Sequence, residues 1–399
     1  MPPRIPPLAV NARSATSALG RGVAAHLQAL RAGRGGLRAN DFSSAPLECC
    51  IGRVQGVEDA ALPPQFAHWE CRNNRLAWIG LNQDGLLDAV RAAVARYGAR
   101  RVAVILGTST ASIGASEEAY RRLRDGRFPD DLRRPGIHTP HSLTAFVAEA
   151  TGIAGPALTV STACSSSAKV FAGAERMLRL GLIDAALVGG VDSLCDSVLF
   201  GFNALELVSP QPCRPFDVRR NGISIGEAAA FALLERADAA PRAPRLIGYG
   251  ESSDAHHMST PHPQGRGAHA ALDDALARAG LRAEQVDYIN LHGTATPKND
   301  EVEAALLAAR FPASVRASST KGFTGHTLGA AGGLEAVFAL AAIEHGFVPG
   351  NHGCGQAEPV CAQQLAPDAE AREVRVALSN SFGFGGNNAC LAFARADFA

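Results

Sequence analysis

The sequence predicts an α/β fold in which buried strands alternate with helices. Short apolar or β-branched runs of strand length are separated by longer stretches whose apolar residues recur with helical spacing. Hydrophobic residues make up 47% of the chain and charged residues 19%, which supports a sizeable core and excludes a disordered chain. The 399 residues correspond to two or three domains, or to one large domain with two halves.

The predicted elements fall into two series. The first comprises a strand over 101–106, a strand over 157–161, a helix over 165–180 and a strand over 185–191. After the Pro- and Ala-rich stretch 239–244, the second comprises a strand over 246–249, a helix over 268–279, a strand over 286–291, a helix over 300–310, and strands over 375–379 and 389–394. Such apolar strands are typical of sheets that helices cover on both faces. The break near residue 240 separates two independent domains, or two halves that share one core.

The charge balance and the lengths of the apolar runs exclude several classes of protein. The 38 lysines and arginines balance 38 aspartates and glutamates, so no nucleic-acid or membrane-surface partner is expected. Segment 1–20 lacks the apolar core of a secretory signal, and the longest clean apolar run, 336–343, is far shorter than the roughly 20 residues of a spanning helix. We therefore expect a cytoplasmic protein. The nine cysteines, odd in number and without a CxxC pair, predict reduced thiols.

Cys164 lies between a predicted strand and a predicted helix, in the segment TVSTACSSSA over 159–168. At a helix N-terminus, unpaired backbone N–H groups and the positive end of the helix dipole lower the pKa of a thiol, and the same groups can stabilise an oxyanion. This position favours Cys164 as a nucleophile over the alternative of a buried small side chain.

Two histidines lie at strand-to-helix junctions in the second series. His292 ends an apolar strand in NLHGTATPKND over 290–300, and His326 follows the rare Lys321 in a Gly-rich loop that leads into a helix of small residues. Ligands of α/β proteins bind at the carboxyl ends of strands. A single histidine in such a place is more often structural, but two of them combined with Cys164 favour a catalytic group.

The segment SNSFGFGGNN over 379–388 is a strand followed by a turn whose glycines permit positive φ and close backbone approach. It forms either an ordinary hairpin turn or a movable gate around Phe384. A phosphate-binding loop is disfavoured, because no Gly-Lys-Ser/Thr follows and the next element is a strand.

Together these four segments resemble the β-ketoacyl-ACP synthases, specifically the elongating condensing enzymes of bacterial fatty acid synthesis and type II polyketide pathways. The resemblance covers nearly the whole chain, from GTS at 107–109 through RPFD at 214–217 to the end. It implies the thiolase fold, in which two similar α/β halves pack into a five-layered αβαβα core. The expected halves are 1–240, which carries the cysteine, and 241–399, which carries the histidines and the Gly-rich gate, with the site between them.

The resemblance implies a role for each candidate residue. Cys164 would accept the acyl group from a carrier-protein thioester, and His292 and His326 would promote decarboxylation of a malonyl unit and stabilise the enolate. Lys321 would match the family's site lysine, which with Glu335 orders the loop carrying His326. This pairing of one cysteine with two histidines differs from the initiating synthases, which use Cys, His and Asn.

Further residues are implied to bind substrate. The backbone N–H groups of Cys164 and Phe384 would form the oxyanion hole, and Phe384 would be the gating phenylalanine. Thr294 and Thr296 match threonines that contact the pantetheine arm. Thr110 matches the position that forms the floor of the acyl tunnel across the dimer interface.

The implied reaction is a decarboxylative Claisen condensation of an acyl-enzyme with malonyl-ACP, which gives 3-oxoacyl-ACP and CO2 without a metal or cofactor. A thiolate suits thioester formation, and imidazole N–H donors in a dry pocket suit a developing enolate. The implied partner is an acyl carrier protein, and the implied assembly is a homodimer or a heterodimer with a second synthase subunit. Because carrier proteins are acidic, arginines near the pocket mouth, with Arg72 and Arg75 as candidates, are expected to dock them.

Two other functions remain open from the sequence. A catalytically silent chain-length subunit typically lacks the nucleophile, so Cys164 argues against it. A degradative thiolase uses a second cysteine near the C-terminus; the turn 383–388 has none, although Cys390 lies just beyond it. Departures from the family pattern, such as Glu206 where a basic docking residue is common, leave specialised polyene or polyketide synthesis open beside general fatty acid synthesis.

Two motifs are interpreted as coincidental. His256, His257 and His262 suggest a metal cluster, but their Pro-rich loop lacks cysteine or carboxylate ligands at suitable spacing. The sequence GVDSL at 190–194 is similar to a phosphopantetheine attachment motif, but it follows a predicted buried strand. The carrier is therefore expected to be a separate protein.

Overall fold

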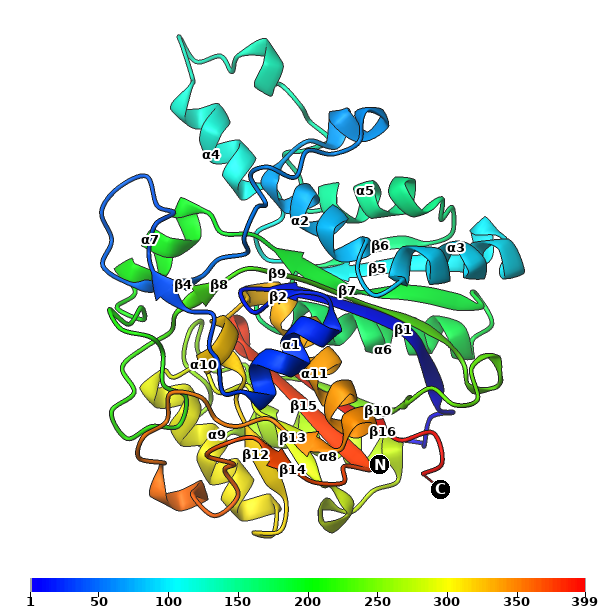
Figure 1. The fold of residues 1–399 in the computed structure, drawn as a ribbon, viewed down its shortest axis with the longest axis vertical. Coiled ribbons are helices and arrows are strands. Elements are labelled where there is room, and N and C mark those ends of the chain that lie inside the picture. The colour runs from blue at the N-terminus through cyan, green and yellow to red at the C-terminus, as the bar shows by residue number, and fades with distance from the viewer. Residues whose placement is uncertain (1, 399) are drawn as a thin grey trace.

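The computed structural model describes residues 2–398, and its main strands form two five-stranded sets with the same order (Figure 1). The first set runs β6 (Ala157–Val160), β5 (Val102–Gly107), β7 (Ala185–Asp192), β9 (Ala228–Arg236), β1 (Leu8–Ser17). The second runs β12 (Arg316–Ser318), β11 (Tyr288–Asn290), β15 (Val376–Gly383), β16 (Asn387–Ala394), β10 (Arg245–Ser253). In both sets the first three strands are parallel and the last two join antiparallel.

The two sets meet edge to edge. Leu8 and Ala9 of β1 pair with Leu246 and Arg245 of β10, which joins them, together with β2 (Gly20–Arg21), into one eleven-stranded sheet. The repeated order confirms the predicted α/β fold with two similar halves. Strand β9 ends at Arg236 and β10 begins at Arg245, so the stretch 239–244 connects the sets. This connection supports the division into 1–240 and 241–399, which stays a prediction.

Two helices, α6 (Ser166–Arg179) and α11 (Ala331–His345), pack between the sets and form the middle layer (Figure 1). The alternation of side chains along each strand builds this core: Ala103 and Ile105 of β5 face the middle layer, as do Leu391 and Phe393 of β16. Segment Leu328–His345 is long and apolar enough to cross a membrane by composition, but 89% of it is buried inside the protein. Packing between the two sets of strands therefore accounts for the apolar character of this segment.

Outer helices complete five layers. Helices α2 (Arg72–Leu81), α3 (Leu86–Tyr97) and α5 (Ser142–Thr151) cover the first set, and α8 (Arg266–Ala279) and α9 (Pro297–Arg310) cover the second. The remaining helices and strands are short: α1 (Val23–Arg31), α4 (Ile113–Arg121), α7 (Asp196–Ala204), α10 (Lys321–Thr324), β3 (Arg38–Ala39), β4 (Cys50–Gly52), β8 (Ile225–Gly226), β13 (Phe347–Val348) and β14 (Glu370–Ala371). Helix α4 projects from the body of the molecule (Figure 1).

All ten predicted elements occur, with shifted ends. The strand predicted over 246–249 extends over Arg245–Ser253, and the helix predicted from 300 begins at Pro297. Strand β9 was not predicted, because its sequence AAAFALLER is rich in good helix formers. Its position between β1 and β7, where all but the last residue is buried, overrides that local preference.

Gly332 lies where α11 crosses α6. A Cβ at this position would lie 2.8 Å from the Cβ and the backbone N of Ala168. We expect Gly332→Ala to lower the free energy of unfolding by about 1–3 kcal/mol, as overpacked cores do, and to lower the thermal unfolding midpoint. Gly201→Ala is the matched control, because its added Cβ meets nothing within 4 Å. Equal midpoints for the two variants would contradict this tight crossing.

Candidate active site

Cys164 lies between β6 and α6, as the sequence predicts. Ser165 is the N-cap of α6, and Ala163, immediately before the cysteine, has a φ of 51° in the left-handed region. A residue with a Cβ adopts that conformation only where its surroundings enforce it. The tight turn directs the cysteine into the interior, where only 6% of the residue is exposed.

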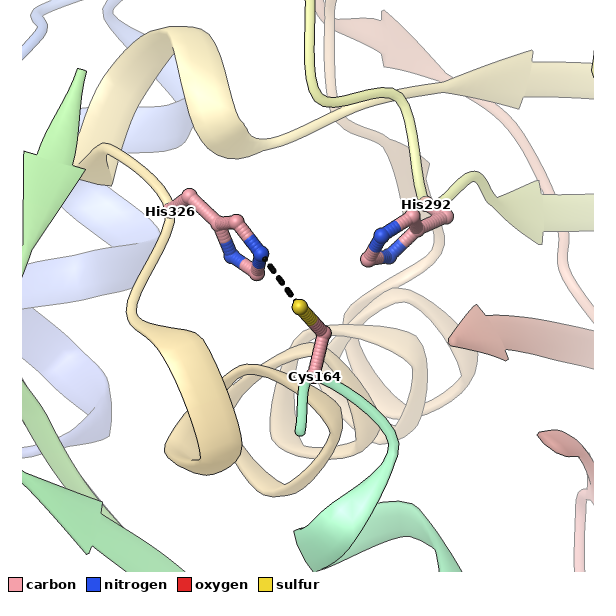
Figure 2. Close-up of side chains that lie close together, drawn as sticks. All are labelled: Cys164, His292 and His326. Atoms are coloured by element: carbon pink, nitrogen blue, oxygen red, sulfur yellow. Dashed lines mark hydrogen bonds between the residues drawn. The ribbon is translucent and has the colours of Figure 1, made fainter. Parts of the chain in front are cut away.

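The side chains of Cys164, His292 and His326 point toward one another (Figure 2). His326 Nε2 lies 2.9 Å from Cys164 Sγ, and the centroids of the two imidazole rings are 5.4 Å apart. His292 follows β11, and His326 lies between α10 and α11. Residues from both halves of the chain thus meet at the N-terminus of α6.

Lys321 and Glu335 form a buried ion pair behind the histidines. The Lys321 ammonium donates to the Glu335 carboxylate and to the backbone carbonyl of His292. Both side chains are at most 3% exposed, so loss of either partner would leave an uncompensated buried charge. The expectation was that this pair orders the loop of His326; its direct contact is with His292.

Two carboxylates that the sequence analysis missed hold the loop of His292. Glu303 accepts the backbone N–H groups of His292 and Gly293, each at 2.8 Å, and Asp300 accepts the N–H of Ala295 at 3.2 Å. Burial raises the pKa of Glu303 to about 7, although these N–H groups oppose the shift. The sequence signal that could have identified them is their spacing: the two carboxylates lie three residues apart on a helix that also carries core leucines.

The surroundings of each imidazole favour one of its two tautomers. The Lys321 ammonium, which has only donors, lies 3.5 Å from His292 Nδ1, so Nδ1 is the acceptor and Nε2 carries the hydrogen. His326 Nδ1 is buried without a hydrogen-bond partner among residues 2–398. An unpaired buried N–H is disfavoured, so Nε2 carries the hydrogen there too. Both histidines therefore present N–H donors to the space around Cys164.

The same tautomers bear on metal binding. One ligand atom from each of Cys164, His292 and His326 lies within 4.8 Å of the others, a spacing that resembles a set of metal ligands. Coordination through Nε2 of His292 would move its hydrogen to Nδ1, which faces the Lys321 ammonium. The group therefore fits hydrogen-bond donation better than metal binding.

Burial raises the pKa of the Cys164 thiol to about 11, and the charge of Lys321 and the backbone N–H groups of Phe384 and Cys164 offset this only in part. The expectation that the helix N-terminus lowers this pKa is therefore wrong for the closed pocket, because desolvation outweighs the helix. Burial, followed by the charge of Lys321, holds the pKa of His292 and of His326 well below 6.5. At neutral pH the thiol is protonated and both imidazoles are neutral.

Alkylation of Cys164 tests this raised pKa. Only the thiolate reacts, and its fraction grows about tenfold per pH unit below the pKa. We therefore expect the rate of iodoacetamide modification, followed by intact mass, to rise steadily from pH 7 to pH 10. Cys164→Ser identifies the background from other cysteines. A plateau below pH 9 would show that the thiol is not shifted upward.

The loop around Phe384 closes one side of the site. The N–H of Phe384 faces the sulfur, and a Cβ on Gly383 would lie 3.2 Å from the N of Cys164, so glycine permits this close approach. The Phe384 ring packs against that of Phe202, with centroids 5.5 Å apart. Gly385 has a φ of 71°, which makes the turn. This arrangement supports the predicted oxyanion hole and gate.

A pocket of about 410 Å³ leads to the sulfur. Its lining includes six of the predicted residues: Cys164, His292, His326, Thr294, Thr296 and Phe384. The hydroxyl groups of Thr294 and Thr296 are hydrogen-bonded to each other at 2.8 Å. Thr110 is not part of this pocket: it lines a separate one of about 100 Å³, and its hydroxyl donates to Asp192. Its role across a dimer interface stays a prediction.

The positions of Ser193 and Cys390 bear on two other interpretations of the sequence. Ser193 of the GVDSL motif is 5% exposed at the end of β7, which supports coincidence rather than attachment. Cys390 belongs to the core beneath the outer helices α8 and α9, and it does not line the Cys164 pocket. A second catalytic cysteine of the thiolase kind is therefore not provided by Cys390.

Arg72 and Arg75, the candidate carrier-docking residues, are paired with carboxylates of the chain. Arg72 donates to the buried Glu227 carboxylate at 2.6 Å and also to Glu58, and Arg75 donates to Glu70. Neither arginine lines the Cys164 pocket. These ion pairs weaken the case for the two arginines as docking residues, and their role stays a prediction.

Comparison with known proteins agrees with this site. The sequence matches the family profiles described as Beta-ketoacyl synthase, N-terminal domain, over residues 73–240 and Beta-ketoacyl synthase, C-terminal domain, over residues 245–354. Nodulation protein E of Rhizobium meliloti (strain 1021) is 36% identical over 306 residues, which cover 74% of this chain and 76% of that protein. The chain belongs to the β-ketoacyl synthase family. The expected family, enzyme class and link to fatty acid or polyketide synthesis are thereby confirmed.

Two further proteins are similar to this chain. The mitochondrial 3-oxoacyl-[acyl-carrier-protein] synthase of Arabidopsis thaliana is 40% identical over 263 residues, and the match spans 61% of this chain and 57% of the plant protein. Among solved structures, a chain of the complex between the ketosynthase ApeO and its chain length factor ApeC from Xenorhabdus doucetiae superposes with a TM-score of 0.89. Its identity is 37%, with 98% of each chain covered.

Proposed function

We propose that this β-ketoacyl synthase joins an acyl group held on Cys164 to a malonyl unit delivered by an acyl carrier protein. The observation that carries the proposal is the placement of Cys164 Sγ 2.9 Å from His326 and beside His292, at the end of a pocket lined by Thr294 and Thr296. Such a pocket suits the narrow pantetheine arm, with the two threonines as its polar contacts.

In the loading step, the Cys164 sulfur attacks the thioester carbonyl of acyl-ACP. The backbone N–H groups of Cys164 and Phe384 hold the oxyanion, and the carrier sulfur leaves with the thiol proton. The products are the acyl-enzyme and the free carrier thiol. In the acyl-enzyme the Cys164 sulfur carries the acyl group in place of the thiol hydrogen, so the raised pKa of the thiol no longer applies.

In the condensing step, malonyl-ACP loses CO2 and its thioester becomes an enolate. The Nε2–H groups of His292 and His326 donate to the enolate oxygen, and neutral donors in a buried site stabilise it better than water. The enolate carbon attacks the acyl carbonyl, and the Cys164 thiolate leaves. The chain released is 3-oxoacyl-ACP, two carbons longer. These steps require no metal or redox cofactor.

The test compares two substrate pairs on the purified protein. Acyl-ACP with malonyl-ACP should give 3-oxoacyl-ACP and CO2, whereas acetoacetyl-CoA with CoA should give no acetyl-CoA. Thiolysis of acetoacetyl-CoA would favour a thiolase, and inactivity with both pairs that persists when a second synthase subunit is supplied would favour a silent chain-length subunit. A series of acyl lengths and unsaturations in the first pair also addresses polyene or polyketide synthesis against general fatty acid synthesis.

For the assembly, a homodimer in the cytoplasm is the first candidate. A heterodimer with a chain-length subunit is the second candidate, and the likeness to a chain of the complex between a ketosynthase and its chain length factor supports it. Light scattering on the chain expressed alone distinguishes them: a stable dimer of twice 41.4 kDa supports the homodimer. A monomer that gains activity with a second subunit supports the heterodimer.

Thr110 gives a prediction about chain length. If this residue forms the floor of the acyl tunnel across the dimer interface, Thr110→Phe fills that space and restricts primers to short chains. Thr110→Ser, which keeps the hydroxyl bonded to Asp192, should keep the original preference. The measurement is the distribution of acyl-enzyme masses from a mixture of primers. An unchanged distribution in a folded Thr110→Phe variant rejects this role.

A further inference from the structure

The opening of the Cys164 pocket carries exposed apolar side chains. Leu205 is 49% exposed and Met258 is 73% exposed, and both line the pocket. Single exposed hydrophobic side chains are ordinary, but a group of them at one opening marks a contact surface. We call Leu205 and Met258 the apolar rim.

The residues that line this opening carry little basic charge. Lys298, with 69% of its side chain exposed, is the only lysine or arginine that lines the pocket within residues 2–398. Its ammonium lies 3.1 Å from Glu301, and the lining also contains Glu206 and Asp254. The opening therefore offers an acidic partner little net attraction.

The apolar rim is held in place beside the gate. Leu205 is the C-cap of α7, and Glu206 after it has a φ of 57°, which turns the chain at the rim. The backbone carbonyl of Met258 accepts the N–H of Gly385 at 2.6 Å, so Met258 is anchored to the loop that carries Phe384. A protein that contacts both residues would thus sit directly over the route to Cys164.

We propose that the acyl carrier protein docks on this enzyme mainly through apolar contact with Leu205 and Met258 rather than through a basic patch. The inference rests on the proposed function, because a carrier that inserts its arm into this pocket must rest on its opening. It also specifies the partner: a carrier with an exposed apolar side chain near the attachment serine and without an acidic residue opposite Glu206.

The first test is the ionic-strength dependence of the KM for octanoyl-ACP. Docking between opposite charges weakens as salt screens them, whereas apolar contact does not. We expect the KM to change by less than about twofold between roughly 50 and 500 mM NaCl. A rise of about tenfold or more across this range would overturn the proposal in favour of a basic docking surface elsewhere.

The second test removes the apolar rim. The double substitution Leu205→Ser with Met258→Ser should raise the KM for octanoyl-ACP about tenfold, given the apolar area that docking would bury. The matched control is Leu182→Ser with Val360→Ser, because these side chains are 55% and 52% exposed and do not line the pocket. Equal effects of the two double variants, or no effect of the first, would overturn the proposal.

A small substrate separates this inference from the proposed function. Octanoyl-CoA lacks the carrier protein but shares the pantetheine arm that enters this pocket, so the rim substitutions should slow its acylation of Cys164 much less than they impair turnover of octanoyl-ACP. If octanoyl-CoA acylates Cys164 but the rim substitutions leave the turnover of octanoyl-ACP unchanged, only the docking inference fails. If no acyl-ACP and no acyl-CoA in a series of chain lengths acylates Cys164, with or without a second synthase subunit, the proposed function itself fails.

Discussion

Cys164→Gln is expected to abolish condensation while decarboxylation of malonyl-ACP continues. The thiol is required only to hold the acyl chain, whereas loss of CO2 requires the pocket and the two histidine donors. The longer amide side chain occupies the acyl position and resembles the loaded enzyme. His292 and His326 remain free to donate to the enolate, because the substitution leaves the contact of His292 with Lys321 in place and removes the sulfur that pairs with His326 Nε2.

The measurement is CO2 release from malonyl-ACP beside formation of 3-oxoacyl-ACP. Cys164→Gln should lose the second activity completely and keep the first. Cys164→Ala is the matched control, because it removes the sulfur without filling the acyl position. Loss of both activities in a folded Cys164→Gln protein would show that the roles are not divided in this way.

Removal of either histidine should have the opposite effect. His292→Ala or His326→Ala deletes one of two donors to the enolate oxygen, and loss of one such donor typically slows catalysis about 10²- to 10³-fold. Some acylation of Cys164 should persist, because the oxyanion donors at Cys164 and Phe384 are backbone groups that the substitutions leave in place. Intact mass reports the acyl-enzyme, and CO2 release reports decarboxylation.

A conservative substitution should separate loss of the N–H donor from loss of local structure. An asparagine or glutamine side chain can replace an N–H donor, so His326→Gln should recover part of the decarboxylation that His326→Ala loses. A variant that abolishes acylation and decarboxylation equally would mean that the histidine supports the fold of the site rather than the enolate. Thermal unfolding midpoints identify that outcome.

Much of the site was predictable because its residues lie where strands end and helices begin. The positions of Cys164, His292 and His326 follow from local sequence, since a buried apolar strand, a polar junction and a helix of small residues each leave a clear pattern. The resemblance to a known family then assigned Thr294, Thr296 and Phe384, which line the same pocket as the cysteine.

Other features depend on packing that no local pattern reveals. The Ala-rich strand β9 is extended because β1 and β7 flank it. The Cys164 pKa is raised because burial of the sulfur outweighs the helix N-terminus, and burial is a property of the whole fold. Glu303 was missed because an acidic residue on a helix usually faces solvent, whereas this one binds two backbone N–H groups inside the protein.

Charge was the least predictable property. Arginines are abundant in the chain, but Arg72 and Arg75 are neutralised by carboxylates brought from other elements. The composition gives equal numbers of positive and negative side chains, but it does not show which of them form ion pairs. The nearly uncharged opening of the pocket emerges only when the loops that carry Leu205, Met258 and Lys298 are brought together.

The central claim is that the chain grows through a covalent intermediate on Cys164. The most direct measurement is intact-protein and peptide mass spectrometry during a single turnover. After octanoyl-ACP is added, the account predicts an octanoyl adduct on the peptide that contains Cys164. When malonyl-ACP follows, the adduct should disappear as equal amounts of CO2 and 3-oxodecanoyl-ACP form. Formation of the product without an adduct on Cys164, or an adduct that malonyl-ACP never discharges, would contradict it.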